Sequence, residues 1–242
     1  MAGVLTSTVA VVLLLAGCQS QDDPTDRSAK PPPAADPTTG APADPTVVEV
    51  SARANIFGAG TDTAPSPQGG GGGVLPPGWE LPDGGKRVVT VPEITGEVTP
   101  IASEYPYNGP GGDGVGATDV SSYGGISGIV NRKNGMFLVG VFLGDEGPTE
   151  QAPERLNVTR AESDRRVHPK LGQTFFVGDG KGKSFIAPAA ATRLYLGFAD
   201  SSYYQGQPGF YNNNSGKLFV RVEVTVDGVT ATPSQATSAA GI

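Results

Sequence analysis

Asp200 is followed ten residues later by residues 210–216, which read Phe-Tyr-Asn-Asn-Asn-Ser-Gly and lead into an alternating strand. This spacing predicts that one carboxylate and several amide oxygens meet at one rim of a β-structure. Calcium takes roughly six to eight oxygen ligands in a flexible shell, so such a ligand set suits it. A rim calcium with open coordination positions can also hold vicinal hydroxyls of a sugar. We therefore expect a calcium-dependent carbohydrate-binding site here.

The same asparagine run is also typical of a plain turn. Asn and Gly tolerate left-handed backbone, and the Asn side chain bonds to its own backbone. The sequence alone leaves both interpretations open.

Short strands must position these residues, since the chain carries 36 Gly and 22 Pro, only 17% charged residues, and no sustained helical period. We expect an all-β fold, a β-sandwich or jelly roll, over residues 47–227, with a brief helix at most in 150–156. An Asn134-Gly135 turn predicts a hairpin, and the apolar run 136–143 predicts a central strand. The predicted strands are 47–57, 86–91, 93–98, 125–130, 136–143, 174–177, 184–186, 192–198 and 217–226.

The N-terminus predicts export and lipid anchoring. An apolar run from Val4 to Ala16 is too short to span a membrane, and it leads into Leu15-Ala16-Gly17-Cys18, which resembles a bacterial lipobox. Residues 1–17 are then a lipoprotein signal peptide, although no Lys or Arg precedes the apolar run. Cys18, the only cysteine, becomes the acylated residue that holds the protein on the extracytoplasmic side of a membrane. An ordinary secretory signal with an unrelated free cysteine is the alternative.

The regions outside the predicted domain are rich in small and polar residues. Residues 18–46 hold the lipidated cysteine and a Pro/Ala/Thr-rich linker that is too polar to fold, and residues 228–242 predict a disordered tail. The net charge of −7 argues against a nucleic-acid partner, because phosphate binding needs a basic surface.

Two stretches of the chain, 185–200 and 208–216, resemble the LecA-type (PA-I) calcium-dependent galactophilic lectins. The first reads Phe-Ile-Ala-Pro and, further on, Leu-Tyr-Leu-Gly-Phe-Ala-Asp; the second reads Pro-Gly-Phe-Tyr-Asn-Asn-Asn-Ser-Gly. From residue 55 onward the chain also looks like a group of exported bacterial proteins built on this sandwich.

This resemblance implies a set of calcium and sugar ligands. Asp200 would give its carboxylate, Asn213 and Asn214 their side-chain oxygens, and Phe210 its backbone carbonyl. A further carbonyl would come from Tyr107 or its neighbour Asn108. Asp200, Ser201 and Asn213 would contact the glycan. The loop after Asp200 is longer than in the lectins, and its Tyr203 and Tyr204, together with Tyr211, are stacking candidates because aromatic rings pair an apolar body with a polar edge. Nothing here matches the lectin's His-Pro-Asp-Gln loop, so galactose specificity does not follow.

Two other classes compete with a lectin. A glycosidase would need paired carboxylates, for which Asp113, Asp179 and Asp200 are candidates. No spacing typical of a catalytic nucleophile or of metal-binding histidines appears, so we expect that the protein is not an enzyme. Asp113 is also a candidate second acidic calcium ligand. The stronger rival is a structural or adhesive surface protein in which calcium only stiffens loops.

Overall fold

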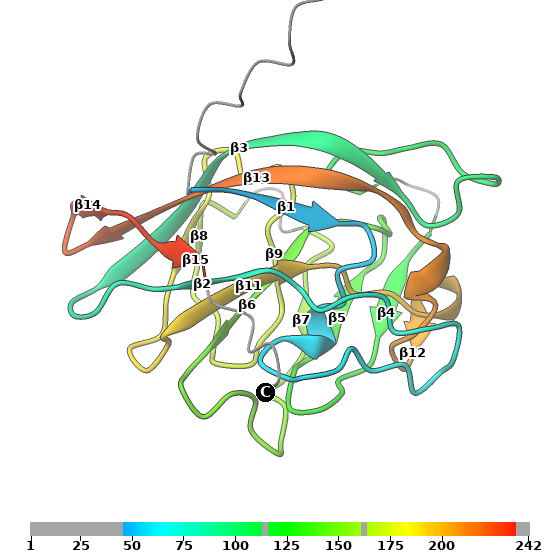
Figure 1. Ribbon diagram of the computed structural model, residues 1–242, viewed down its shortest axis with the longest axis horizontal. Coiled ribbons are helices and arrows are strands. Elements are labelled where there is room, and N and C mark those ends of the chain that lie inside the picture. Colours follow the sequence, from blue (N-terminus) through cyan, green and yellow to red (C-terminus); the bar gives the residue numbers. More distant parts are fainter. Residues whose placement is uncertain (1–45, 113–115, 161–163, 236–242) are drawn as a thin grey trace, which may run out of the picture. The chain divides into compact units, whose positions relative to one another are not determined.

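The computed structural model describes residues 46–112, 116–160 and 164–235, all within one compact unit of the chain, residues 42–242. The predicted signal peptide, Cys18 and nearly all of the linker lie outside the described residues. The described residues are mostly β-strand with almost no helix, which confirms the predicted all-β sandwich (Figure 1).

The strands, in chain order, are β1 (Val47–Ser51), β2 (Gly78–Glu80), β3 (Arg87–Thr99), β4 (Thr118–Val120), β5 (Ile129–Asn131), β6 (Val139–Leu143), β7 (Leu156–Asn157), β8 (Arg166–Val167), β9 (Phe175–Phe176), β10 (Ser184–Ile186), β11 (Arg193–Gly197), β12 (Gln205–Gly206), β13 (Ser215–Val226), β14 (Val229–Ala231) and β15 (Ser234–Gln235). Three short 3-10 helices accompany them: η1 (Ile56–Gly58), η3 (Ser202–Tyr204) and η4 (Tyr211–Asn213).

Two sheets make the sandwich. One has the order β1-β13-β3-β10-β8, with β14 also paired to β13, and the other has the order β15-β2-β11-β6-β9. Figure 1 shows β1, β13 and β3 side by side at the top of the view, with β11, β6 and β9 below them. Every second residue of β13 from Leu218 to Val224 is fully buried, so this strand presents one apolar face to the space between the sheets.

The five-stranded sheet is covered on both faces. On one side, Trp79, Phe142 and Leu194 pack with the inward residues of β13 and β3. On the other side, Val139 and Val141 pack with Ile56 of η1 and Ile129 of β5. All residues of β6 are therefore buried, as the apolar run 136–143 predicts.

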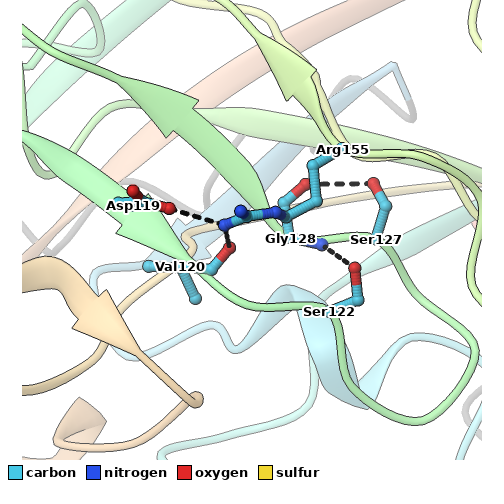
Figure 2. A network of polar contacts seen from close by, with 6 residues as sticks. All are labelled: Asp119, Val120, Ser122, Ser127, Gly128 and Arg155. Atoms are coloured by element: carbon cyan, nitrogen blue, oxygen red, sulfur yellow. Dashed lines mark hydrogen bonds and ion pairs between the residues drawn. The ribbon is translucent and has the colours of Figure 1, made fainter.

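A third sheet, of order β12-β4-β5-β7, lies beyond this second core. Figure 2 shows how Arg155, just before β7, reaches across to β4: its Nη1 donates to Asp119 Oδ1 at 2.6 Å and to the Val120 carbonyl at 3.0 Å. In the adjacent loop, the Gly128 amide donates to Ser122 Oγ at 3.0 Å. Polar contacts thus link the start of β7 to β4 and close the loop between β4 and β5.

The Arg155–Asp119 ion pair is exposed, with side-chain exposures of 36% and 47%, so its net contribution is small. We expect Asp119→Asn to lower the free energy of unfolding by less than about 1 kcal/mol in urea titrations. A loss of several kcal/mol would show that the pair is worth more than exposed ion pairs usually are.

Several sequence predictions need correction. The predicted hairpin does not form: β5 pairs with β4 and β7, whereas β6 pairs with β11 and β9 in another sheet. Residues 86–91 and 93–98 form one strand, β3, in which Pro92 lies opposite a register shift in β13 between Arg221 and Glu223. This irregularity accommodates a proline that cannot donate to a regular ladder. The brief helix in 150–156 is absent, and residue 156 opens β7 instead.

The predicted tail from residue 228 is also corrected, because β14 and β15 lie within it. Asp227 and Gly228 have φ values of 50° and 85°, and they turn the chain so that β14 pairs back onto β13. β15 then pairs with β2 beside Trp79, so the ordered domain extends to Gln235. Residues 236–242 lie outside the described residues.

Candidate functional site

A cavity of about 450 Å³ lies where β11 ends and β13 begins. Seven of the sequence-predicted site residues line it: Asp200, Ser201, Tyr203, Tyr204, Phe210, Asn213 and Asn214. The other lining residues are Pro100, Ile101, Glu104, Tyr105, Gly116, Ala117, Ser202 and Gln205. The structure therefore brings the acidic residue after β11 and the asparagine turn before β13 into one cavity.

Asp200 forms part of the buried floor of this cavity, with 4% of its surface exposed. Its Oδ1 accepts from the Ser201 amide at 2.8 Å, and its Oδ2 accepts from Asn214 Nδ2 at 2.9 Å. Burial raises the pKa of Asp200 to about 7, and these two hydrogen bonds oppose that rise only in part. No cation among the described residues acts on this carboxyl, so ionising it is costly.

Tyr211 fixes the backbone of Asp200. Its hydroxyl accepts from the Asp200 amide at 2.9 Å and donates to the Phe198 carbonyl at 2.9 Å. Because the Tyr211 side chain is fully buried, it cannot stack on a sugar, which corrects that expectation. Burial also raises the pKa of Tyr211 well above its ordinary value, so the hydroxyl keeps its proton.

Asn214 joins three chain segments at the cavity floor. Its Nδ2 donates to the Ala52 carbonyl, just after β1, at 3.1 Å and also to the Asp200 carboxylate. Its Oδ1 is buried without a hydrogen-bond partner in the structure, and so is Ser201 Oγ. A buried polar atom without a partner carries a desolvation cost, so these two oxygens mark a place where a ligand is expected.

The three asparagines of the turn have different roles. Asn213 is exposed and lines the cavity. Asn212 instead faces the glycine run 69–73, where its Oδ1 accepts from Arg53 Nη2 at 2.9 Å and from the Gly73 amide at 3.2 Å. The composition of the run did not distinguish these positions; only the resemblance selected Asn213 and Asn214.

The glycine run 69–73 packs tightly against this turn. A Cβ on Gly70 would overlap Phe210, and a Cβ on Gly71 would overlap the Asn212 amide. Phe210 itself has a φ of 66°, in the left-handed region that residues with a side chain rarely adopt. The glycine run is therefore a close-packed support for residues 210–212.

Tyr107 is not among the residues that line the cavity, and neither is its alternative, Asn108. The Val98–Asn108 bridge folds this loop back along β3, where the Tyr107 ring lies beside Gly216. As a result Tyr105 reaches the cavity from this loop, and so does Glu104, which the sequence did not indicate. Tyr107 therefore does not join the predicted ligands.

The other acidic candidates do not join the site. Asp179 is exposed, outside the cavity lining, in the turn between β9 and β10, and Asp113 lies outside the described residues. Within the described ranges, no cluster of three or more His, Cys, Asp or Glu side chains is arranged to hold a metal. The oxygen atoms at the cavity come mainly from amide, hydroxyl and carbonyl groups. Calcium can bind such oxygens together with a single carboxylate.

Comparisons of the chain with protein-family models, with characterised proteins and with solved structures return no match. What is established is the fold and the cavity: an all-β sandwich with a cavity lined by acidic and aromatic residues. In the part of the chain that the structure describes, no helix has the length and apolarity needed to cross a membrane.

Proposed function

We propose that this protein is a calcium-dependent carbohydrate-binding module. The observation that carries the proposal is the buried carboxylate of Asp200 beside two buried oxygens, Asn214 Oδ1 and Ser201 Oγ, that have no hydrogen-bond partner. A buried charge needs an opposite charge or several hydrogen bonds to be stable. A hard cation that prefers oxygen ligands would meet all three needs at once.

The residues of the cavity fit such an ion. Asp200 would supply the charge, Asn213 and Asn214 the side-chain oxygens, and Phe210 its backbone carbonyl. One carboxylate with mostly neutral ligands indicates modest affinity, in the range of extracellular calcium modules. When bound, calcium would supply open coordination positions for sugar hydroxyls.

The chain's own side chains would then hold the sugar. Ser201 offers hydrogen bonds near the floor, the exposed Asn213 offers them further out, and Tyr203 and Tyr204 offer aromatic rings with polar edges. A cavity of about 450 Å³ is within the usual range for small-molecule sites.

The proposed location of the module is the outer side of a bacterial membrane. The lipobox-like residues before Cys18 support it, because an acylated cysteine followed by a Pro-rich linker would hold the sandwich away from the lipid surface. Metabolic labelling with a palmitate analogue, compared between the parent and Cys18→Ala, tests this part independently of the sugar site.

A structural calcium site without sugar binding is the second candidate. It is supported by Asn214, which already links the end of β1, Asp200 and the start of β13, so an ion there would stiffen three segments at once.

A glycan array probed with calcium and again with EGTA separates these two candidates. We expect binding that disappears in EGTA, together with a calcium-dependent rise in melting temperature, because a ligand that binds only the folded state stabilises it. A calcium-dependent rise with an empty array would favour the structural candidate. Calcium-independent melting would contradict both, and hydrolysis of a screened glycoside would return the protein to the enzyme class.

A further inference from the structure

Two adjacent residues at the cavity, Tyr203 and Tyr204, have left-handed backbone, with φ values of 52° and 56°. Both lie in η3, in the segment that leaves β11 and enters β12. Residues with a Cβ rarely adopt this conformation, and two in succession are kept only where the surroundings hold them. Such strained positions are found preferentially at binding sites.

The contacts on both sides of the turn hold it in place. Gln68 Oε1 accepts from the Ser202 amide at 2.7 Å, and Gln68 Nε2 donates to the Gln205 carbonyl at 3.3 Å. Beyond the turn, β12 pairs in parallel with β4. The backbone on either side of Tyr203 is therefore fixed by one side chain and one strand pairing.

The two tyrosines are placed differently. The Tyr204 ring packs on the backbone of Gly116 and Gly135, since a Cβ on either would come within 3.0 Å of ring atoms. Tyr203 in contrast is 87% exposed, more than any other large apolar residue that the structure describes. A rigid backbone thus presents an uncovered aromatic ring at the mouth of the cavity.

The depth of the cavity separates Tyr203 from the floor. Asp200, Ser201 and Asn214 are only 3–4% exposed, whereas Tyr203 stands almost entirely in solvent. A sugar ring held by its hydroxyls at the floor would therefore not cover the face of the Tyr203 ring, which stays available to a second sugar ring of the same ligand. The apolar C–H face of a pyranose ring is a suitable partner for that face.

We propose that Tyr203 is a stacking platform for a second sugar ring, so that the ligand is an oligosaccharide rather than a single sugar, and that Gln68 is the residue that positions this platform. This inference rests on the proposed carbohydrate function.

Tyr203→Gly is the most informative variant, because it removes the ring and also relieves the left-handed strain, so it should not unfold the protein. Titration calorimetry on the calcium-loaded full chain would compare galactose, glucose, mannose and N-acetylglucosamine with lactose, cellobiose, mannobiose and chitobiose. We expect one disaccharide to bind about tenfold more tightly than its monosaccharide in the parent, and this advantage to disappear in Tyr203→Gly. The calcium-induced shift in melting temperature should not change, because Tyr203 is not among the expected calcium ligands.

Gln68→Ala tests the positioning role. Alone, it should reduce the ratio of disaccharide to monosaccharide affinity, but in the Tyr203→Gly background it should have no further effect, because the ring that Gln68 positions is then absent. The four proteins form a double-mutant cycle that measures the coupling between the two residues. Tyr123→Ala, which removes an exposed tyrosine outside the cavity, is the matched control and should bind like the parent.

Equal affinity for mono- and disaccharides in the parent would overturn this inference, and so would a preference for the disaccharide that is unaltered in Tyr203→Gly. In either case, calcium-dependent binding of a monosaccharide would still support the proposed function. Additive effects of the two substitutions would overturn the role of Gln68. Absence of both calcium stabilisation and sugar binding would instead remove the proposed function and this inference with it.

Discussion

Replacing Asp200 by Asn is expected to abolish the rise in melting temperature that calcium gives the parent protein. The carboxylate is the charged group at the floor of the cavity, and neutral amide and hydroxyl oxygens alone bind calcium weakly. The fold should survive, because Asn keeps the shape of Asp and an oxygen for the Ser201 amide, but some stability should be lost, because the new Nδ2 cannot accept the hydrogen bond that Asn214 donates to Asp200 Oδ2.

The same substitution should also remove a pH dependence of the calcium-free protein. The pKa of Asp200 is about 7 in the folded state against 3.8 as its ordinary value. Below pH 3.8 the carboxyl is protonated in both states and carries no penalty. As pH rises toward 7 the unfolded state loses its proton first, so the folded state loses stability, by roughly 4 kcal/mol in total.

Calcium should reverse this trend, since it binds the ionised carboxylate. Its stabilising effect should therefore increase with pH up to and through neutrality. Urea unfolding from about pH 3.5 to 9, with calcium and with EGTA, would measure both effects. Asp179→Asn is a matched control in an exposed turn and should behave like the parent. An Asp200→Asn protein that still responds to calcium would place the ion elsewhere.

Tyr211→Phe is the second substitution expected to have a large effect. Removing one oxygen leaves the Asp200 amide and the Phe198 carbonyl without the hydroxyl that both contact. Because this hydroxyl is fully buried, we expect a loss of about 3 kcal/mol in the free energy of unfolding. Calcium affinity should fall as well, since Tyr211 holds the backbone of the residue that supplies the carboxylate.

Urea unfolding and a calcium titration of the same variant would measure the two effects. Tyr123→Phe is the control, because Tyr123 is exposed, and the stability of this variant should change by less than about 0.5 kcal/mol. A Tyr211→Phe protein as stable as the parent would mean that water replaces the hydroxyl and that Tyr211 does not hold the backbone of Asp200.

Much of the fold was predictable because local pattern and burial agree. The alternation from Leu218 to Val224 and the apolar run around β6 correspond to a one-sided strand and a two-sided strand. The pairing of β5 was not predictable, because the Asn134-Gly135 signal indicates a turn but not which sheet the chain enters next. The Asp227-Gly228 turn, by contrast, was a readable hairpin signal that would have placed β14.

The candidate site was predictable in part. Asp200, Asn213 and Asn214 meet as the spacing and the resemblance implied. Gln68 and Glu104 were missed, because each reaches the site through a loop whose path depends on tertiary packing and carries no periodic pattern. Tyr107 was misplaced for the same reason, since one backbone bridge to Val98 turns its loop away from the cavity.

The glycine run beside the asparagine turn also bears on how this protein can change over generations. A side chain on Gly70 would overlap Phe210 and one on Gly71 would overlap Asn212, so a mutation to any larger residue at either position would push Phe210 or Asn212 aside. Such a mutation would alter the shape of the cavity without replacing a single residue that lines it. New ligand preferences could therefore arise from a segment that never contacts the ligand.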